Sequence, residues 1–581
     1  MNPSTHAAPR PESSSGTRVG LALLLLLALM LRLVGLEHGL PHSTEPDGLV
    51  FASQTALIRA GDPEPERVRE WGYYPQLVPR LAALLPAPAR AQNAPAQLDA
   101  QLEEAARDWR DPRLVVALFS LLAVPATFLL ARRFLPGGWS LVAAGLAGTS
   151  TLTLWFAQQA RPHAAAAALA LCAVLAALRV LESGAWIDVL LAGLAAALAL
   201  GSLQFGVFTL GAVGLALLLA PGRGWGWRLA AGASVLLQVA LSVLAFYPFL
   251  FARSAPAGKL GLGGGEIELS GHVIYGGLFN GRGAATVLRA LADYDPWIAL
   301  VSLAGLVVLG VALARGERPR RERTRALLVV LGYVLPFLLA IALYQRTYQR
   351  FVIPLVPFLA LAAAAGAARV APRGMIARSV LALALLVPQV ALGARLAQLR
   401  SRPDTVAQAA RWLEEHPQLR EQRVLFLPTQ DLPLPLDEQA LAANARMMDT
   451  PARPWFTYQQ ALPPERRVTP GWKLFSMPLQ AAAQKQLAQD VLGYLRALRA
   501  DYFLIEVYTG GRKPVLLAPL YPALAAVAQR VVRIAPEDGD ESDDLPLTWA
   551  DDEYPRQECW ALRLFQAERL GPVMEIWRAM P

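Results

Sequence analysis

The hydrophobic residues of this chain gather in long runs instead of alternating with polar ones. Between residues 19 and 396, apolar runs of about 20 residues recur, which is the length of a helix that crosses a hydrocarbon core of roughly 30 Å. The pattern therefore predicts about eleven membrane-spanning helices. The predicted spans are 19–36, 114–131, 139–156, 163–181, 185–201, 203–220, 229–251, 297–314, 326–344, 351–368 and 376–396.

The first run is expected to remain in the protein. It is longer and more apolar than the core of a typical signal peptide, and no pair of small residues marks a cleavage site after it. It leads directly into Glu37 and, ten residues later, Asp47. The sequence therefore predicts a carboxylate just outside the far end of the first span.

The arginines indicate the orientation of these spans. With the N-terminus in the cytoplasm, the Arg-rich segments all fall on one side, as the excess of positive charge in cytoplasmic loops requires. These segments hold Arg10, Arg18, Arg132, Arg133, Arg179, Arg223, Arg228, the cluster at 315–325, Arg369, Arg373 and Arg378. The formal net charge of +9 is mostly this bias, so nothing indicates a nucleic-acid partner. We expect a multi-pass protein of a bacterial-type inner (plasma) membrane.

The remaining residues divide the chain into three predicted parts. Residues 1–18 are rich in Ser and Pro and are expected to form a disordered cytoplasmic tail. Residues 19–396 form the membrane domain, with outer loops at 37–112 and 252–296. Residues 397–581 have the composition of a soluble domain, expected outside the cytoplasm. The fold class is a polytopic α-helical membrane protein with a C-terminal extracytoplasmic α/β domain.

Local patterns predict some elements of the outer parts. Segments 47–61 and 95–109 have the spacing of amphipathic helices, which would lie along the membrane and frame a cavity. In the C-terminal part, 405–414 is expected to be a helix with Asp404 or Thr405 as its N-cap. Strands are expected at 423–428, 502–508 and 574–577. The glycine-rich segment 259–266 would form either a gate over a ligand or a merely flexible loop.

Several function classes lack their sequence signatures. The chain contains no P-loop, dinucleotide fingerprint, HExxH or Gly-x-Ser-x-Gly motif. Cys172 lies within a predicted span and Cys559 in the predicted outer domain, so the two are not expected to form a disulfide. They also do not have the sequence spacing of metal ligands.

Other motifs resemble those of the GT-C glycosyltransferases. The segment 29–36, followed by Gly39-Leu-Pro41, Asp47 and Gly61-Asp-Pro63, is similar to the opening of that family. Ala157-Gln-Gln-Ala-Arg-Pro-His163 resembles its Glu-Ala-Arg-Pro-Tyr-like segment, and 346–357 resembles its Arg-Tyr-x-x-Pro-x-x-Pro segment. The tail also fits at 402–405, 412–413, 500–502 and 571–578. The resemblance covers nearly the whole chain.

The resemblance implies an integral membrane enzyme that uses a polyprenyl-phosphate sugar, as do protein O-mannosyltransferases and the lipid A aminoarabinose transferase. It implies inverting transfer of the sugar to an envelope lipid, glycan or protein on the outer face of the inner membrane, with Asp47 as the base. The chain departs from the family in two places. Asp47 is followed by Gly48 where the family often has Glu, so Glu45 is a candidate substitute. The family's second carboxylate is missing, and Gln158, Gln159 and His163 stand in that region.

The expected chemistry needs a base for the acceptor proton and cations for the departing phosphate. Asp47 is the natural base, although a loop carboxylate is usually only solvated. Arg346 and Arg350 are candidate phosphate ligands because guanidinium groups match phosphate oxygens, and Arg161 is a candidate assistant. Arginines at membrane boundaries also commonly extend toward the lipid headgroups, and Arg32 is expected to do so.

Three further hypotheses concern the ligand sites. Tyr74 would stack on a sugar face or belong to an aromatic belt at the membrane surface. His163 would contact substrate or simply cap or pack at the start of its helix. A divalent metal is possible as a cofactor, with His38, His42, Glu45 and Asp47 as its candidate ligands, although such residue sets are common by chance.

Two other function classes stay open. The first is a transporter or flippase for a lipid-linked envelope component, which the scarcity of charged residues within the spans disfavours. The second is an inactive scaffold of the GT-C type, which the missing second carboxylate favours.

Overall fold

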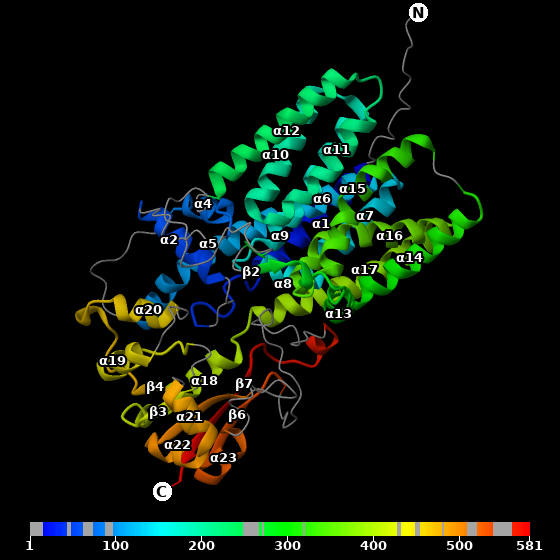
Figure 1. The fold of residues 1–581 in the computed structure, drawn as a ribbon. Coiled ribbons are helices and arrows are strands. Elements are labelled where there is room, and N and C mark those ends of the chain that lie inside the picture. Colours follow the sequence, from blue (N-terminus) through cyan, green and yellow to red (C-terminus); the bar gives the residue numbers. More distant parts are fainter. Residues whose placement is uncertain are drawn as a thin grey trace, which may run out of the picture.

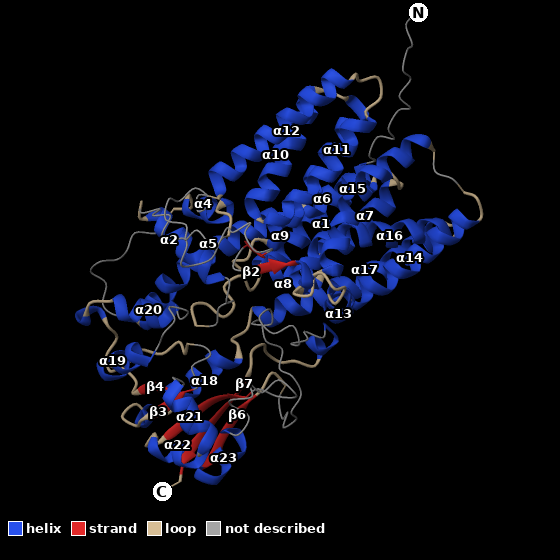
Figure 2. Ribbon diagram, in the orientation of Figure 1, coloured by secondary structure: helices blue, strands red, loops and turns tan. Residues whose placement is uncertain are grey.

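The computed structural model describes residues 15–42, 48–61, 74–86, 97–247, 266–269, 272–317, 320–426, 431–447, 454–478, 481–507, 520–537 and 561–580. Figures 1 and 2 show a bundle of long helices and, at the C-terminal end of the chain, a smaller part that contains the main sheet. The candidate metal ligands Glu45 and Asp47, the segment 259–265 and Cys559 lie outside the described residues.

The bundle confirms the prediction of a polytopic helical fold. Within the described residues, eight helical segments are long and apolar enough to cross a membrane, and nine are if the bent pair α7–α8 counts as one span. Two shorter apolar segments account for the other predicted runs. In chain order the elements of the bundle are α1 (Ser15–Leu33), α5 (Leu98–Leu121), α6 (Ala123–Ala131), α7 (Gly137–Gly148), α8 (Thr151–Ala157), α9 (His163–Ser183), α10 (Trp186–Ser202), η1 (Gln204–Phe208), α11 (Thr209–Leu219), α12 (Trp225–Phe246), α14 (Pro296–Ala314), α15 (Arg321–Leu343), η4 (Gln349–Leu355), α16 (Val356–Val370) and α17 (Met375–Arg400).

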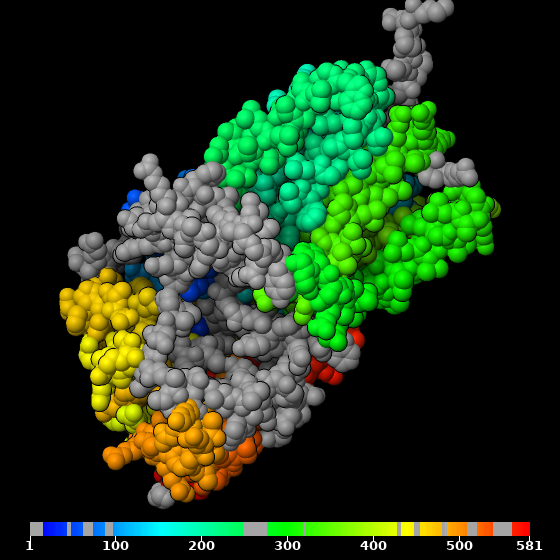
Figure 3. Space-filling model, in the orientation of Figure 1, coloured from blue at the N-terminus to red at the C-terminus, as the bar shows by residue number. Residues whose placement is uncertain are grey.

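Large apolar side chains cover the outside of this bundle. Leu236, Leu237 and Leu241 of α12 and Leu303 of α14 are exposed, as expected for residues that face lipid. In the space-filling view, α11 and α12 (teal) and α14 (green) form a broad surface away from the C-terminal part (Figure 3).

Glycines allow two pairs of helices to pack closely. A Cβ at Gly305 of α14 would lie 2.3 Å from the carbonyl oxygen of Ala362, and one at Gly366 of α16 would lie 2.3 Å from the Cα of Gly305. Similarly, a Cβ at Gly211 of α11 would lie 2.1 Å from the carbonyl oxygen of Gly332 in α15. Because small residues let helix backbones approach within a membrane, these positions fix the two helix pairs.

Arg32 does not extend to the headgroups, so that expectation is wrong. Its side chain is fully buried. Its Nε donates to Ser120 Oγ at 2.8 Å, and its Nη1 donates to the carbonyl oxygens of Ala28 and Gly148, both at 3.0 Å. Gly148 is the last residue of α7, where a cation meets the negative end of the helix dipole. Arg32 therefore ties α1 to α5 and α7.

The first outer loop contains α2 (Gly48–Arg59) and α4 (Leu77–Ala83). The helix expected at 95–109 is not separate: α5 begins at Leu98 and continues through Pro112 to Leu121. The second outer loop contains β1 (Glu266–Leu269) and β2 (His272–Tyr275), which pair antiparallel, then η3 (Gly276–Leu278) and α13 (Gly283–Tyr294).

The C-terminal part is built on a five-stranded sheet of order β4-β3-β5-β7-β6. The strands β3 (Val424–Phe426), β4 (Leu474–Ser476) and β5 (Tyr502–Val507) run parallel, and β7 (Val573–Ala579) is antiparallel to β5 and to β6 (Ala528–Ile534). The surrounding helices are α18 (Thr405–Glu414), α19 (Glu438–Met447), α20 (Pro454–Ala461), α21 (Ala481–Gln489), α22 (Val491–Ala497) and α23 (Leu520–Val527), with η8 (Ala561–Phe565) before β7. The three predicted strands and the predicted helix are present, and Asp404 is the N-cap, accepting from the Ala407 N–H at 2.7 Å.

This sheet-containing part contacts α5 and α17 of the membrane domain. Tyr458 of α20 donates to Glu104 of α5 at 2.8 Å. Arg395 of α17 donates to the carbonyl oxygens of Leu564 and Ala567 at 2.9 and 2.6 Å. The C-terminal part is thus held on the ends of α5 and α17, which extend beyond the spans predicted at 114–131 and 376–396.

Candidate functional site

A pocket lies where α9, η1 and η4 meet. It is small and partly open. His163 and Arg350 supply its polar groups, and Tyr333, Phe205 and Leu203 supply much of its apolar wall. Three alanines on one face of α9, at 166, 167 and 170, leave room for it.

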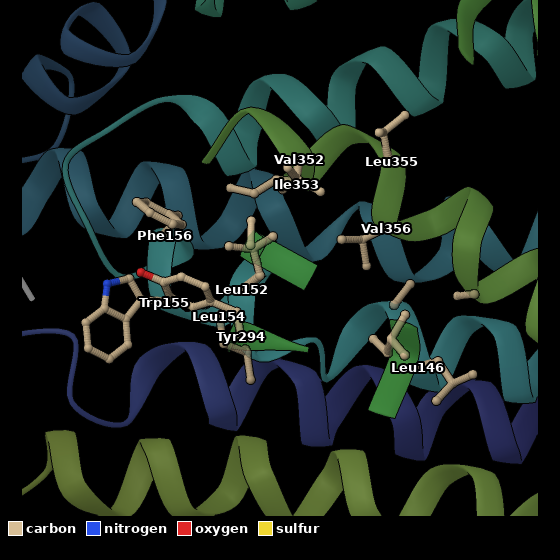
Figure 4. Packing of buried hydrophobic residues seen from close by; sticks show 14 of the residues in the cluster. Leu146, Leu152, Leu154, Trp155, Phe156, Tyr294, Val352, Ile353, Leu355 and Val356 are labelled. Carbon is tan, nitrogen blue, oxygen red and sulfur yellow. The ribbon is translucent and has the colours of Figure 1, made fainter. Parts of the chain in front are cut away.

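The apolar packing of η4 places Arg350 at this pocket. Figure 4 shows Val352 and Ile353 of η4 above Leu152 and Phe156 of α8, and all four belong to one buried cluster. Val352 and Ile353, which follow Arg350 in sequence, therefore fix the start of η4 against α8.

Arg350 and His163 form the central contact of the pocket. Arg350 Nε donates to His163 Nε2 at 3.2 Å, and both side chains are buried. Since a guanidinium N–H can only donate, His163 Nε2 accepts and the imidazole is neutral. The guanidinium carbon lies 4.2 Å from the Tyr348 ring centroid, and the His163 ring stacks on Phe351 at 5.8 Å. A buried cation is thus held between aromatic faces.

The other two candidate arginines lie differently. Arg161 is buried in the connection between α8 and α9. Arg346 is exposed, in the turn between α15 and η4, and does not line the pocket. Of the three arginines, Arg350 is thus the one whose contact with His163 lines the pocket.

The first outer loop reaches the same pocket. The Tyr74 ring lies 5.1 Å from the ring of Phe51 in α2. Both pack in a buried cluster with Ala160, Ala166 and Leu203, and the last two of these also line the pocket. Asp47 and Glu45 precede α2 directly in sequence but lie outside the described residues.

The connection between α8 and α9 is anchored to the first and last spans. Gln158 Nε2 donates to the carbonyl oxygens of Leu31, Arg32 and Val34 at 3.0, 3.2 and 2.6 Å, which satisfies the C-terminal end of α1. Arg400, at the end of α17, donates to the carbonyl oxygen of Trp155 at 3.4 Å.

Asp295 fixes the other end of α8, a role that the sequence analysis missed. This fully buried carboxylate accepts from Ser150 Oγ at 2.5 Å, the Thr151 N–H at 2.7 Å and Gln389 Nε2 at 2.8 Å. A carboxylate at a helix N-terminus satisfies its N–H groups and its dipole. The only signal in the sequence was the Asp-Pro pair at 295–296, which marks the start of α14 but not a contact with α8.

The root of the first loop, residues 36–42, is held by polar contacts from two sides. Arg113 Nη1 donates to the carbonyl oxygens of Leu36 and His38, both at 2.9 Å. His42 Nε2 lies 3.2 Å from the carboxylate of Asp404, the N-cap of α18. The loop root is thus joined directly to the start of the C-terminal part.

These contacts shift two pKa values. Burial lowers the pKa of His38 to about 3, and the charges of Arg400 and Arg113 act in the same direction against Asp404. For Asp404, burial alone would raise the pKa, but the charge and hydrogen bond of His42 outweigh it and lower the pKa to about 2.

The candidate metal ligands can be followed only in part. Among the residues that the structure describes, no three His, Cys, Asp or Glu side chains are grouped so that they could hold a metal ion. His42 is engaged with Asp404, and His38 lies buried beside it. Metal binding by His38, His42, Glu45 and Asp47 stays a prediction.

Comparison with known proteins gives matches at the level of structure. No protein-family model matches the chain. No curated protein matches it in sequence. Among solved structures, 88% of this chain aligns with 73% of the oligosaccharyltransferase of Archaeoglobus fulgidus in its apo form, at 12% identity and a TM-score of 0.45. ArnT from Cupriavidus metallidurans, bound to undecaprenyl phosphate, aligns over 97% of its length with 90% of this chain, at 14% identity and a TM-score of 0.40.

A third match is the arabinofuranosyltransferase AftD from Mycobacteria, at 15% identity and a TM-score of 0.39. It aligns with 98% of this chain, which covers 40% of that longer protein. These three solved structures are thus an oligosaccharyltransferase, ArnT and an arabinofuranosyltransferase.

Proposed function

We propose that this chain is a membrane glycosyltransferase that moves a sugar from a polyprenyl-phosphate donor to an acceptor of the cell envelope. The observation that carries the proposal is the contact between Arg350 and His163. The two residues belong to the segments 157–163 and 346–357, which resemble the GT-C family in sequence, and they meet at one buried pocket. The acceptor is a lipid, a glycan or a protein at the outer face of the inner membrane.

The reaction assigns distinct work to the residues around the pocket. An acceptor oxygen or nitrogen attacks the anomeric carbon, the bond from that carbon to the phosphate oxygen breaks, and polyprenyl phosphate leaves. The acceptor proton passes to a base. Charge therefore develops on the leaving phosphate, where a fixed cation lowers the barrier most in surroundings that exclude water.

Arg350 is proposed as the phosphate ligand. Its guanidinium is buried, so little water screens its charge, and its planar donors suit phosphate oxygens. His163, accepting from Arg350 Nε, is proposed as a positioning residue that orients the guanidinium. Arg161, buried in the adjoining connection, is a further candidate, whereas exposed Arg346 would act only at the entrance.

Asp47 is proposed as the base, which makes the transfer inverting. It stands one residue before α2, and Phe51 of that helix packs in the cluster that adjoins the pocket. Glu45 is the proposed second carboxylate. Tyr74, in the same cluster, is proposed to border the sugar.

The test is sugar transfer by the purified protein in nanodiscs, with envelope extract as the source of acceptor. A panel of polyprenyl-phosphate hexoses and pentoses is offered to the wild type, Asp47→Asn, Arg350→Met and Arg373→Gln. We expect Asp47→Asn to lower kcat by about 10²–10⁴-fold. Arg350→Met should lower kcat/KM by about 10²–10³-fold. Arg373 is exposed and remote from the pocket, so its variant serves as the control.

Two outcomes would contradict the proposal. Wild-type rates in Asp47→Asn would exclude Asp47 as the base. Donor binding without turnover, with extract supplied, would favour the transporter or the inactive scaffold.

A further inference from the structure

Three buried glutamines around the pocket have amide atoms without a protein partner. Gln54 of α2 is fully buried and Gln159, in the connection from α8 to α9, is 1% exposed. Within the described residues, neither amide atom of these two side chains has a hydrogen-bond partner, and the same holds for Oε1 of Gln349, at the start of η4. Leaving a buried polar group unpaired is unfavourable, so these amides call for a ligand.

Each of these glutamines has chain neighbours at or beside the pocket. Ala160, next to Gln159, belongs to the same buried cluster as Phe51, which lies one turn before Gln54 on α2. Gln349 directly precedes Arg350, which lines the pocket. The three glutamines therefore lie on α2, on the connection to α9 and on η4, beside residues that line the pocket or pack against its wall.

A neighbouring glutamine shows the difference between a structural amide and those of Gln54 and Gln159. Gln158 is buried to the same extent as Gln159, but its Nε2 donates to three carbonyl oxygens at the end of α1. Within the described residues, Oε1 of Gln158 has no partner, whereas in Gln159 both amide atoms have none.

The amides also limit the chemistry of the ligand. An amide both donates and accepts, which matches a hydroxyl group, whereas an ammonium group needs an acceptor with negative charge.

We propose that Gln159, together with Gln54, binds hydroxyl groups of the donor's sugar and selects a neutral sugar over an amino sugar. This inference rests on the proposed function for the identity of the donor. Gln159 is then a specificity-determining residue of the donor site.

Binding measurements isolate this contact without requiring turnover. The wild type, Gln159→Leu, Gln159→Glu and the control Gln486→Leu, which changes an exposed glutamine of α21, are titrated in nanodiscs with two ligands. The ligands are undecaprenyl-phosphate mannose and undecaprenyl phosphate. We expect Gln159→Leu to weaken binding of the mannosyl lipid by about 5–100-fold, the equivalent of the cost of one lost buried hydrogen bond. Binding of undecaprenyl phosphate should stay unchanged, which a general loss of structure would not allow.

A second arm tests selectivity with undecaprenyl-phosphate aminoarabinose. Gln159→Glu should shift the ratio of affinities toward the amino sugar by about tenfold or more, because the carboxylate pairs with its ammonium group. Equal affinity of the wild type and Gln159→Leu for the mannosyl lipid would overturn the proposal, as would a wild-type preference for the amino sugar.

The third arm separates donor from acceptor and this inference from the proposed function. In the transfer assay, a raised KM for a glycan acceptor with unchanged donor binding would overturn the donor assignment and place the amides at the acceptor. Absence of transfer with every donor would sink the proposed function, whereas a loss of sugar-specific binding in Gln159→Leu would still support the amide contact.

Discussion

Arg32 and Arg350 are both buried arginines, but their surroundings differ. Carbonyl oxygens at the end of α7 and within α1 accept from Arg32, so its charge serves the helix packing. Arg350 is held by an imidazole and aromatic rings at a pocket, so its charge faces a space that a ligand can enter. Only the second arrangement suits the binding of an anion.

At this scale, we predict that acid destabilises the protein through His38. The pKa of this side chain is about 3 in the folded protein, against about 6.5 in an unfolded chain. The stability of the neutral, buried ring is therefore fully present above pH 6.5 and is lost as the pH falls toward 3, by about 1.4 kcal/mol per pH unit. His38→Gln should therefore lose less stability than the wild type when the pH falls from 6.5 to 5.5.

The measurement is the Tm of the purified protein at pH 7.5, 6.5 and 5.5. The control is His416→Gln, since His416 is only partly buried, in the C-terminal part. Parallel Tm curves for the wild type and His38→Gln would show that His38 does not cause the acid sensitivity.

The sequence predicted the residue types of the site better than their roles. Arg350 and His163 were both candidates, and the structure joins them. The same reasoning assigned Arg32 to the membrane surface, because a sequence shows that an arginine is near a span's end but not which carbonyl oxygens surround it. The importance of Asp295 depends on Ser150 and Gln389, which are distant in sequence.

Among the elements, the contact between α14 and α16 illustrates how glycine sets helix spacing. Gly305→Ala should destabilise the protein by about 1–3 kcal/mol, since its Cβ would meet the backbone at Ala362. Gly310→Ala on the same helix has no atom within 4 Å of the new Cβ and should be neutral or slightly stabilising, because Ala favours helix more than Gly does. Thermal unfolding of both variants in one detergent checks this prediction. A similar decrease in Tm for both would show that close packing at Gly305 is not the cause.

Hydrophobic runs predicted the existence of the helices but not their breaks. The run at 139–156 contains no charged residue, yet α7 and α8 are bent by 51° because Asp295 supplies hydrogen bonds for a new helix start. The strands β4 and β6 were missed for local reasons. The first has three residues, and the second has exposed Gln and Arg side chains that conceal its alternation.

For the whole molecule, the pair His42–Asp404 connects the first outer loop to the C-terminal part. We predict that Asp404→Asn loosens residues 36–42 while keeping α18, since Asn also serves as an N-cap. Losing a buried, charge-assisted hydrogen bond should speed amide hydrogen exchange in 36–42 by about tenfold or more.

Hydrogen exchange read by mass spectrometry tests this prediction. Asp490→Asn is the matched control, because Asp490 caps α22 in the same sheet-containing part without contacting the first loop. Unchanged exchange at 36–42 in Asp404→Asn would show that the contact between His42 and Asp404 does not hold the loop root.

The buried position of Arg350 has a consequence for turnover. If it binds the donor phosphate as proposed, it meets a phosphodiester with one negative charge before transfer and a phosphate monoester with nearly two afterwards, since the second pKa of such a group is near 6. A fixed cation that water does not screen attracts the spent lipid carrier more strongly than the loaded one. The residence time of the carrier, rather than bond breaking, would then limit the rate, and the enzyme would slow down as discharged carrier accumulates in the membrane.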